Sequence, residues 1–168
     1  MLVTSNTLWR DFESIADIVS EETKERITLA AMRERLGVKS WYDMTVGVYL
    51  DYVSGDVAQA GIKDDATVYE HYYAEALQAF AEQFAKTLEA LTLKREGDEI
   101  AASEGCVPMS EVEGALVFLR RYFGLPSFND VRKLTLNEWL IAKHDDFNNA
   151  LFRRNYNKIQ QRKSKQKK

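Results

Sequence analysis

The residues from Asp64 to Arg95 carry the pattern that most restricts the fold of this chain. Apolar side chains recur there every three or four residues, at Tyr69, Tyr73, Leu77, Phe80, Phe84, Leu88 and Leu91. This spacing places them on one face of an α-helix, and the residues between them are mainly Ala, Glu, Gln and Lys, which favour helix. Thr67 and Glu70 have the spacing of a capping box, which satisfies the first amides of a helix. We therefore expect one long helix over about residues 67–93.

A second feature is a stretch that occurs twice, from Gly37 to Leu50 and from Gly124 to Leu140. Both copies read Gly, apolar, any residue, Ser, aromatic, any residue, Asp, apolar, and end in Thr, apolar, two residues, aromatic, Leu; the second copy has three additional residues before its Thr. A glycine can end a helix in the left-handed conformation, and a threonine can cap the next helix. Each copy therefore predicts two helices joined by a short linker, over about residues 22–53 and 110–142.

Other local signals complete the expected fold. Residues that can cap helices occur at Asn6 or Thr7, at Ser20, at Ser110 with Glu113, and at Thr135 with Glu138. The pattern fails between residues 94 and 108, where we expect a loop, and no segment alternates long enough to predict a strand. The sequence therefore predicts an all-α protein with one domain over residues 1–156. We expect an irregular bundle of about six helices, in which the two related helix-linker-helix units pack around the long central helix.

Length and composition limit the class of protein. A chain of 168 residues with 45% apolar and 29% charged residues is typical of one globular domain. No apolar run approaches the roughly 20 residues of a membrane helix. The first residues lack the pattern of a signal peptide, and the single Cys106 cannot form an internal disulfide. We expect a cytoplasmic protein that makes no membrane contact, with Cys106 as a small apolar filler.

Motifs for catalysis or cofactor binding are missing from the sequence. It contains no GxxxxGK[ST], GxGxxG or GxSxG motif, so it offers no phosphate-binding loop or nucleophile elbow. His71 lies four residues before Glu75, and His144 precedes two aspartates, but two imidazoles without a Cys pair are a poor ligand set for zinc. We therefore expect no enzyme activity, no cofactor and no metal.

The charge is unevenly distributed. After Asp146 the chain has eight basic and no acidic residues; because the total is −3, residues 1–152 carry −11. The basic residues that could bind a partner are Arg153, Arg154, Lys158, Arg162, Lys163 and Lys165. They could neutralise nucleic-acid phosphates or bind an acidic protein, including the body of a neighbouring subunit. Alternatively, residues 157–168 form a disordered, solubilising tail.

Nucleic-acid binding can be considered at a second place. Residues 30–38 are similar to the first half of a DNA-binding helix-turn-helix, with Gly37 in the turn. Such a motif needs a small residue where Arg33 lies and a buried aliphatic residue where Asp43 lies, and the acidic body repels DNA. We therefore expect weak nucleic-acid binding or none. The alternative is a nucleic-acid-associated or virion structural protein that uses the basic C-terminal tail.

Two short phrases carry a family resemblance. Met44-Thr45-Val46-Gly47-Val48-Tyr49-Leu50 and Leu134-Thr135-Leu136-Asn137-Glu138-Trp139-Leu140 resemble the helix openings of small helical bacteriophage proteins of the tail-assembly-chaperone kind. The resemblance covers about 30 of the 168 residues. It implies a non-enzymatic morphogenesis factor in the host cytoplasm that binds the long apolar tape-measure protein and tail subunits until the tail polymerises.

An amphipathic helix could bind such a partner through its apolar face. Tyrosine combines apolar area with a polar tip and is common at protein interfaces, and the aromatic end of the long helix is rich in it. With helix-in-groove spacing, we expect the partner-binding residues to be Tyr69, Tyr73, Leu77 and Phe80. The same surface could also form a homo-oligomer.

Overall fold

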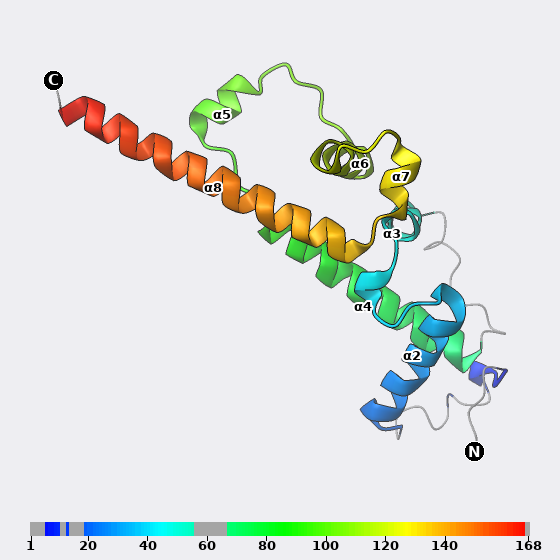
Figure 1. Cartoon of the computed structure of the whole chain (residues 1–168). Coiled ribbons are helices and arrows are strands. Elements are labelled where there is room, and N and C mark those ends of the chain that lie inside the picture. The colour runs from blue at the N-terminus through cyan, green and yellow to red at the C-terminus, as the bar shows by residue number, and fades with distance from the viewer. Residues whose placement is uncertain (1–5, 11–12, 14–18, 56–66, 167–168) are drawn as a thin grey trace.

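A computed structural model describes residues 6–10, 13, 19–55 and 67–166, and the fold is all-α, as predicted (Figure 1). The helices are α2 (Glu21–Leu36), the short 3-10 helix η1 (Trp41–Asp43), α3 (Val46–Val53), α4 (Val68–Ala90), α5 (Gly97–Ala102), α6 (Glu111–Phe123), α7 (Phe128–Lys133) and α8 (Leu136–Gln166). The described residues contain no strand, only two isolated bridges. The first helix that the sequence predicts, from about residue 7 to residue 19, lies largely outside the described residues.

The long helix predicted over residues 67–93 is confirmed as α4, from Val68 to Ala90. The amide of Glu70 donates to the Thr67 hydroxyl (3.2 Å), and the Glu70 carboxylate accepts from the Thr67 amide (2.8 Å). These two bonds form the predicted capping box. The amide of Val68 donates to the carbonyl of Thr7 at 2.8 Å, so the N-terminal segment is tied to the start of α4.

The two repeated linkers follow closely similar backbone paths. Gly37 (φ 66°, ψ 14°) ends α2 and Gly124 (φ 63°, ψ 32°) ends α6, both in the left-handed conformation that glycine adopts without strain. Met44 (φ −61°, ψ 142°) and Leu134 (φ −59°, ψ 151°) then occupy equivalent positions before the two threonines. The three additional residues of the second copy therefore lengthen η1 into the six-residue helix α7.

The core lies where these linkers meet α4. Its fully buried side chains come from both units and from the long helix: Met44, Val46, Phe84, Leu119, Val131 and Leu136. The rings of Tyr49 and Trp139, which are equivalent in the two copies, contact Phe84 of α4 at centroid distances of 5.1 and 5.6 Å. A second cluster of Ile27, Val68 and Tyr72 joins α2 to the first half of α4. The predicted arrangement of two units around one long helix therefore agrees with the packing.

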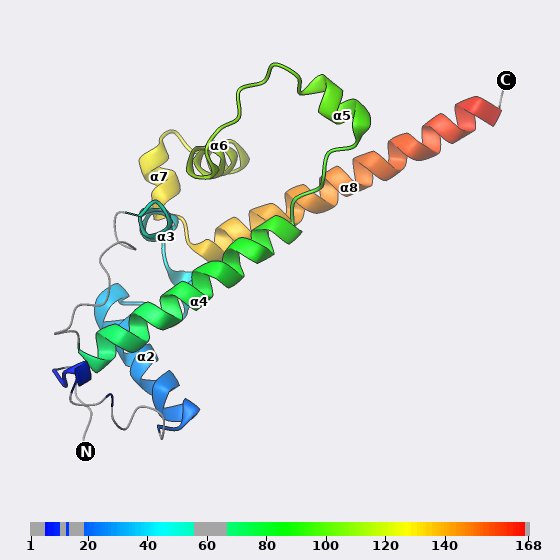
Figure 2. The same cartoon turned by 180° about the vertical axis from the view of Figure 1, so that it is seen from behind.

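Two expected segments differ from the structure. Residues 94–108 contain the short helix α5 within the expected loop. Residues 157–166, expected to belong to a disordered tail, are instead helical and continue α8 to Gln166. No Gly or Pro follows Leu136, and lysines near the C-terminus suit the helix dipole. Figures 1 and 2 show α8 beside α4 at its start and extending well past the end of α4.

Candidate functional site

The four residues predicted to bind a partner are largely covered by the chain itself. Leu77 is only 5% exposed and belongs to the core. Tyr73 lies against Trp41, with ring centroids 5.6 Å apart, and Phe80 stacks on the same indole at 5.7 Å. Tyr69 packs against the cluster between α2 and α4. α2 and η1 therefore pack on this face of α4, where Tyr69, Tyr73 and Phe80 are partly buried.

Large apolar side chains are exposed instead on the second half of α8. Phe152 is 69% exposed, Tyr156 52% and Ile159 49%, and we call these three residues the apolar stripe of α8. Their spacing of four and three places them on one side of the helix, and the rings of Phe152 and Tyr156 stack with centroids 6.2 Å apart. The sequence analysis missed this stripe, although the spacing of its three residues is visible in the sequence.

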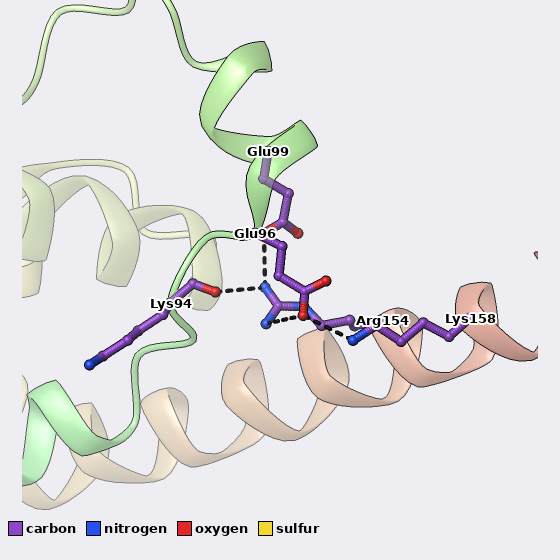
Figure 3. Close-up of polar contacts among 5 residues, drawn as sticks. All are labelled: Lys94, Glu96, Glu99, Arg154 and Lys158. Atoms are coloured by element: carbon purple, nitrogen blue, oxygen red, sulfur yellow. Dashed lines mark hydrogen bonds and ion pairs between the residues drawn. The ribbon is translucent and has the colours of Figure 1, made fainter.

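The segment that contains α5 is fastened to α8 by ion pairs (Figure 3). The guanidinium of Arg154 donates to the Lys94 carbonyl (3.0 Å) and to the Glu99 carboxylate (2.9 Å). Lys158 donates to Glu96 at 2.9 Å, and Arg154 also lies 3.5 Å from that carboxylate. We call residues 94–99 the acidic strap. It fixes the middle of α8 at a point beyond the end of α4.

The surroundings of Glu99 in the strap favour its ionised form. The pKa of Glu99 lies below its ordinary value because the Glu96 amide donates to its carboxylate and because Arg154 and Arg95 lie nearby. Arg95, Arg153 and Arg154 line one open cleft beside the strap. Arg154 is therefore neutralised within the chain, whereas no ion pair of Arg95 or Arg153 is seen among the described residues.

The six basic residues predicted to bind a nucleic acid or an acidic protein fall into two groups. Arg154 and Lys158 are held by the acidic strap. The exposed side chains without an ion pair in the described part of the chain are Arg153, Arg162, Lys163 and Lys165. At 100° per residue these four lie on different sides of α8. The structure therefore does not gather them into one basic face.

Neither histidine belongs to a cluster of possible metal ligands among the described residues. His71 stacks on Trp9 with centroids 3.5 Å apart, and its Nε2 lies 3.3 Å from Glu75, while His144 is exposed. Cys106, expected as an apolar filler, is also exposed. Among the residues that the structure describes, no three His, Cys, Asp or Glu side chains gather as metal ligands. None of the described helices combines the length and the apolar character needed to cross a bilayer.

No family model, no curated protein and no solved structure matches this chain.

Proposed function

We propose that this protein is a non-enzymatic binding factor in the assembly of a phage or phage-derived tail, and that its contact surface is the second half of α8. The observation that carries the proposal is the apolar stripe, which stands on a helix that extends beyond the rest of the domain. Full burial of one large apolar side chain is worth about 1.5–3 kcal/mol. A partner that covered Phe152, Tyr156 and Ile159 would therefore gain several kcal/mol.

The helix itself gives a second argument. Residues 155–166 of α8 are all exposed, with Lys158 tied to the strap by its ion pair, so this end of the helix gains little of the tertiary packing that stabilises most helices in proteins. Binding of another helix along the stripe would stabilise this segment, with anchors at i, i+4 and i+7. A role in phage assembly is supported by the resemblance of residues 44–50 and 134–140 to the helix openings of tail-assembly chaperones.

The test is co-expression of the tagged chain with the products of its neighbouring genes, among which the proposal requires a tape-measure or tail-tube protein. We expect that partner to co-purify with the wild type and to be lost from the double variant Phe152→Ala/Tyr156→Ala. Both side chains are more than half exposed, so the thermal midpoint should stay within a few degrees of the wild-type value.

The matched control is Val107→Ala, which removes an apolar side chain that is 89% exposed and lies outside α8. It should retain the partner. Capture by the double variant, or the absence of any tail gene beside this one, would contradict the proposal.

A second candidate function is nucleic-acid binding, favoured by the cations of α8 that have no ion pair in the described structure. Replacement of Arg162, Lys163 and Lys165 by Gln removes three charges and leaves the apolar stripe intact. If these residues contact phosphates, DNA retention should fall and its salt dependence should become shallower. Retention that is unchanged by the triple variant would eliminate this function.

A further inference from the structure

We infer that the apolar stripe of α8 binds a second copy of this chain, with the two α8 helices packed antiparallel. This inference rests on the proposed role of the stripe as a binding surface and names its first partner. A homodimer of this kind would offer the groove between two helices, rather than one bare helix, to a third helix from a tail protein.

The stripe is the centre of a longer pattern on α8. The residues Asp145, Asn149, Phe152, Tyr156, Ile159 and Lys163 follow one another at spacings of four, three, four, three and four, and all are exposed. We call this set the seam. Alternating spacings of three and four are those of the contact positions in a coiled coil. The seam spans 19 residues, or roughly 27 Å at 1.5 Å per residue.

The strap and the buried core bind α8 outside the seam, although the seam residue Asp145 accepts a hydrogen bond from Tyr122 of α6. At 100° per residue, Arg154 points to the side of α8 opposite the middle of the seam. The strap therefore binds the side of α8 that faces away from the seam. The side chains through which α8 joins the core are Leu136, Trp139 and Ala142, which lie before the seam begins. A second helix can approach the seam without displacing either.

Charge determines the direction in which two seams can pair. If the helices run antiparallel about a two-fold axis between Phe152 and Tyr156, these two side chains contact each other across the axis, twice in the dimer. Asn149 then lies opposite Ile159, and Asp145 lies opposite Lys163 at both ends. Each copy presents the same patch, as a two-fold dimer requires. The antiparallel register thus places apolar contacts in the centre and opposite charges outside.

Parallel pairing would bring each residue against itself. Asp145 would then face Asp145, and Lys163 would face Lys163, and like charges at such positions are unfavourable. The Asp145 carboxylate is held in place by the Tyr122 hydroxyl (2.9 Å) and the Asn149 amide (3.0 Å). Lys163 has no ion pair in the described structure, so its charge is available. In the antiparallel dimer Arg153 would lie beside the two-fold axis and approach Arg153 of the second copy, so that two like charges would meet there.

Sedimentation equilibrium of the full chain tests dimer formation. We expect a concentration-dependent monomer–dimer equilibrium. Phe152→Ala should weaken it at least about tenfold, because truncation of a central aromatic residue typically costs more than 1 kcal/mol and each dimer loses two contacts. Val107→Ala should leave it unchanged, and Arg153→Ala should strengthen it. A chain that stays monomeric at all concentrations overturns the inference.

Disulfide crosslinking tests the direction of pairing. Because Cys106 is exposed, both variants are made in a Cys106→Ser background: one carries Asn149→Cys, and the other carries Ile159→Cys. We expect a disulfide-linked dimer when the two variants are mixed and oxidised, and little when either is oxidised alone. Crosslinking of each variant with itself indicates parallel helices and overturns the inference, as does failure of the mixture to crosslink.

The outcomes also separate this inference from the proposed function. A monomeric chain that still captures a tail protein through Phe152 and Tyr156 would leave the assembly function standing and remove the homodimer. A crosslinked dimer that captures no tail protein would support the homodimer and remove the assembly function.

Discussion

Thr45 and Thr135 lie opposite each other in an antiparallel bridge between the two repeated linkers. The amide of Val46 donates to the Leu134 carbonyl at 2.7 Å, and the amide of Leu136 donates to the Met44 carbonyl at 2.9 Å. The two bonds are therefore equivalent to each other under the repeat, since Val46 corresponds to Leu136 and Leu134 corresponds to Met44. The first amide of α3 and the first amide of α8 have no partner within their own helices, and each is satisfied by the other unit where the side chains are fully buried.

The caps of these two helices are unequal, and this predicts unequal effects of the same substitution. In the second copy the Glu138 carboxylate accepts from the Thr135 amide at 2.7 Å, and the Glu138 amide donates to the Thr135 hydroxyl at 3.2 Å. Thr135→Ala should lower the free energy of unfolding by about 1 kcal/mol. The measurement is urea denaturation followed by circular dichroism.

The first copy has Val48 where the second has Glu138, and the Thr45 hydroxyl accepts only a long bond of 3.4 Å from the Val48 amide. Thr45→Ala should therefore cost less than Thr135→Ala, whereas Thr135→Ser should be close to wild type. An equal or larger loss at Thr45 would show that the capping box contributes nothing beyond a single cap.

Two helical glycines should respond to alanine with opposite signs. A Cβ at Gly47 of α3 would lie 3.0 Å from the Arg132 carbonyl oxygen and 3.1 Å from the Arg132 Cβ. Because α7 presents backbone at this contact, Gly47→Ala should destabilise the protein by about 1–3 kcal/mol, although alanine is the better helix former.

Gly114 of α6 is the matched control, because no heavy atom lies within 4 Å of the position of its Cβ. Gly114→Ala should stabilise the protein by up to about 1 kcal/mol. Both values come from the midpoints of thermal or denaturant unfolding. A stabilising substitution at Gly47 would mean that α3 and α7 are packed less closely than described.

Tyr49 predicts a loss of stability at high pH. Burial raises the pKa of its hydroxyl from 10.0 to about 12, with a smaller contribution from Glu111. Because the folded pKa lies above the unfolded value, the contribution to stability is complete below pH 10 and is lost as the pH rises through about 12. In Tyr49→Phe, the free energy of unfolding should fall less between pH 10 and 12 than in the wild type. An unchanged pH dependence would show that other groups govern alkaline unfolding.

The acidic strap can be loosened without damage to the core. In Arg154→Met the bonds to Lys94, Glu96 and Glu99 are lost, and amide hydrogen exchange of residues 94–102 should become faster. Global stability should change by no more than about 1 kcal/mol, because the acids of the strap are about half exposed to solvent.

The neighbouring Arg153, for which no ion pair is seen among the described residues, is the control for the loss of positive charge. Arg153→Met should leave exchange in the strap as it is in the wild type. Similar acceleration in both variants would indicate that the general charge of α8, and not the specific bonds of Arg154, holds the strap.

Much of the local structure was predictable from the sequence because its causes lie within a few residues. The boxes at Thr67, Ser110 and Thr135, the left-handed Gly37 and Gly124, and the extent of α4 all depend on side chains three or four positions apart. The likeness of the two linkers was equally visible. Each of these features would be much the same in any fold with the same helices.

The candidate site could not be predicted in this way, because two helices of the sequence each have an apolar face that could bind a partner. The aromatic face of α4 and the stripe of α8 both have helical spacing. The packing of α2 and of Trp41 against α4 covers much of the first. Burial is a property of the whole packing, so no local pattern reveals which face remains open.

By itself the sequence determined the helices, their caps and their ends, since these depend on neighbours along the chain. The tertiary structure decided that Thr45 would meet Thr135 and that Arg154 would bind a strap 55 residues away from it at Glu99. It also decided that Phe152 would stay exposed. These outcomes follow from contacts between distant segments, whose free energy depends on how the helices fit together in space.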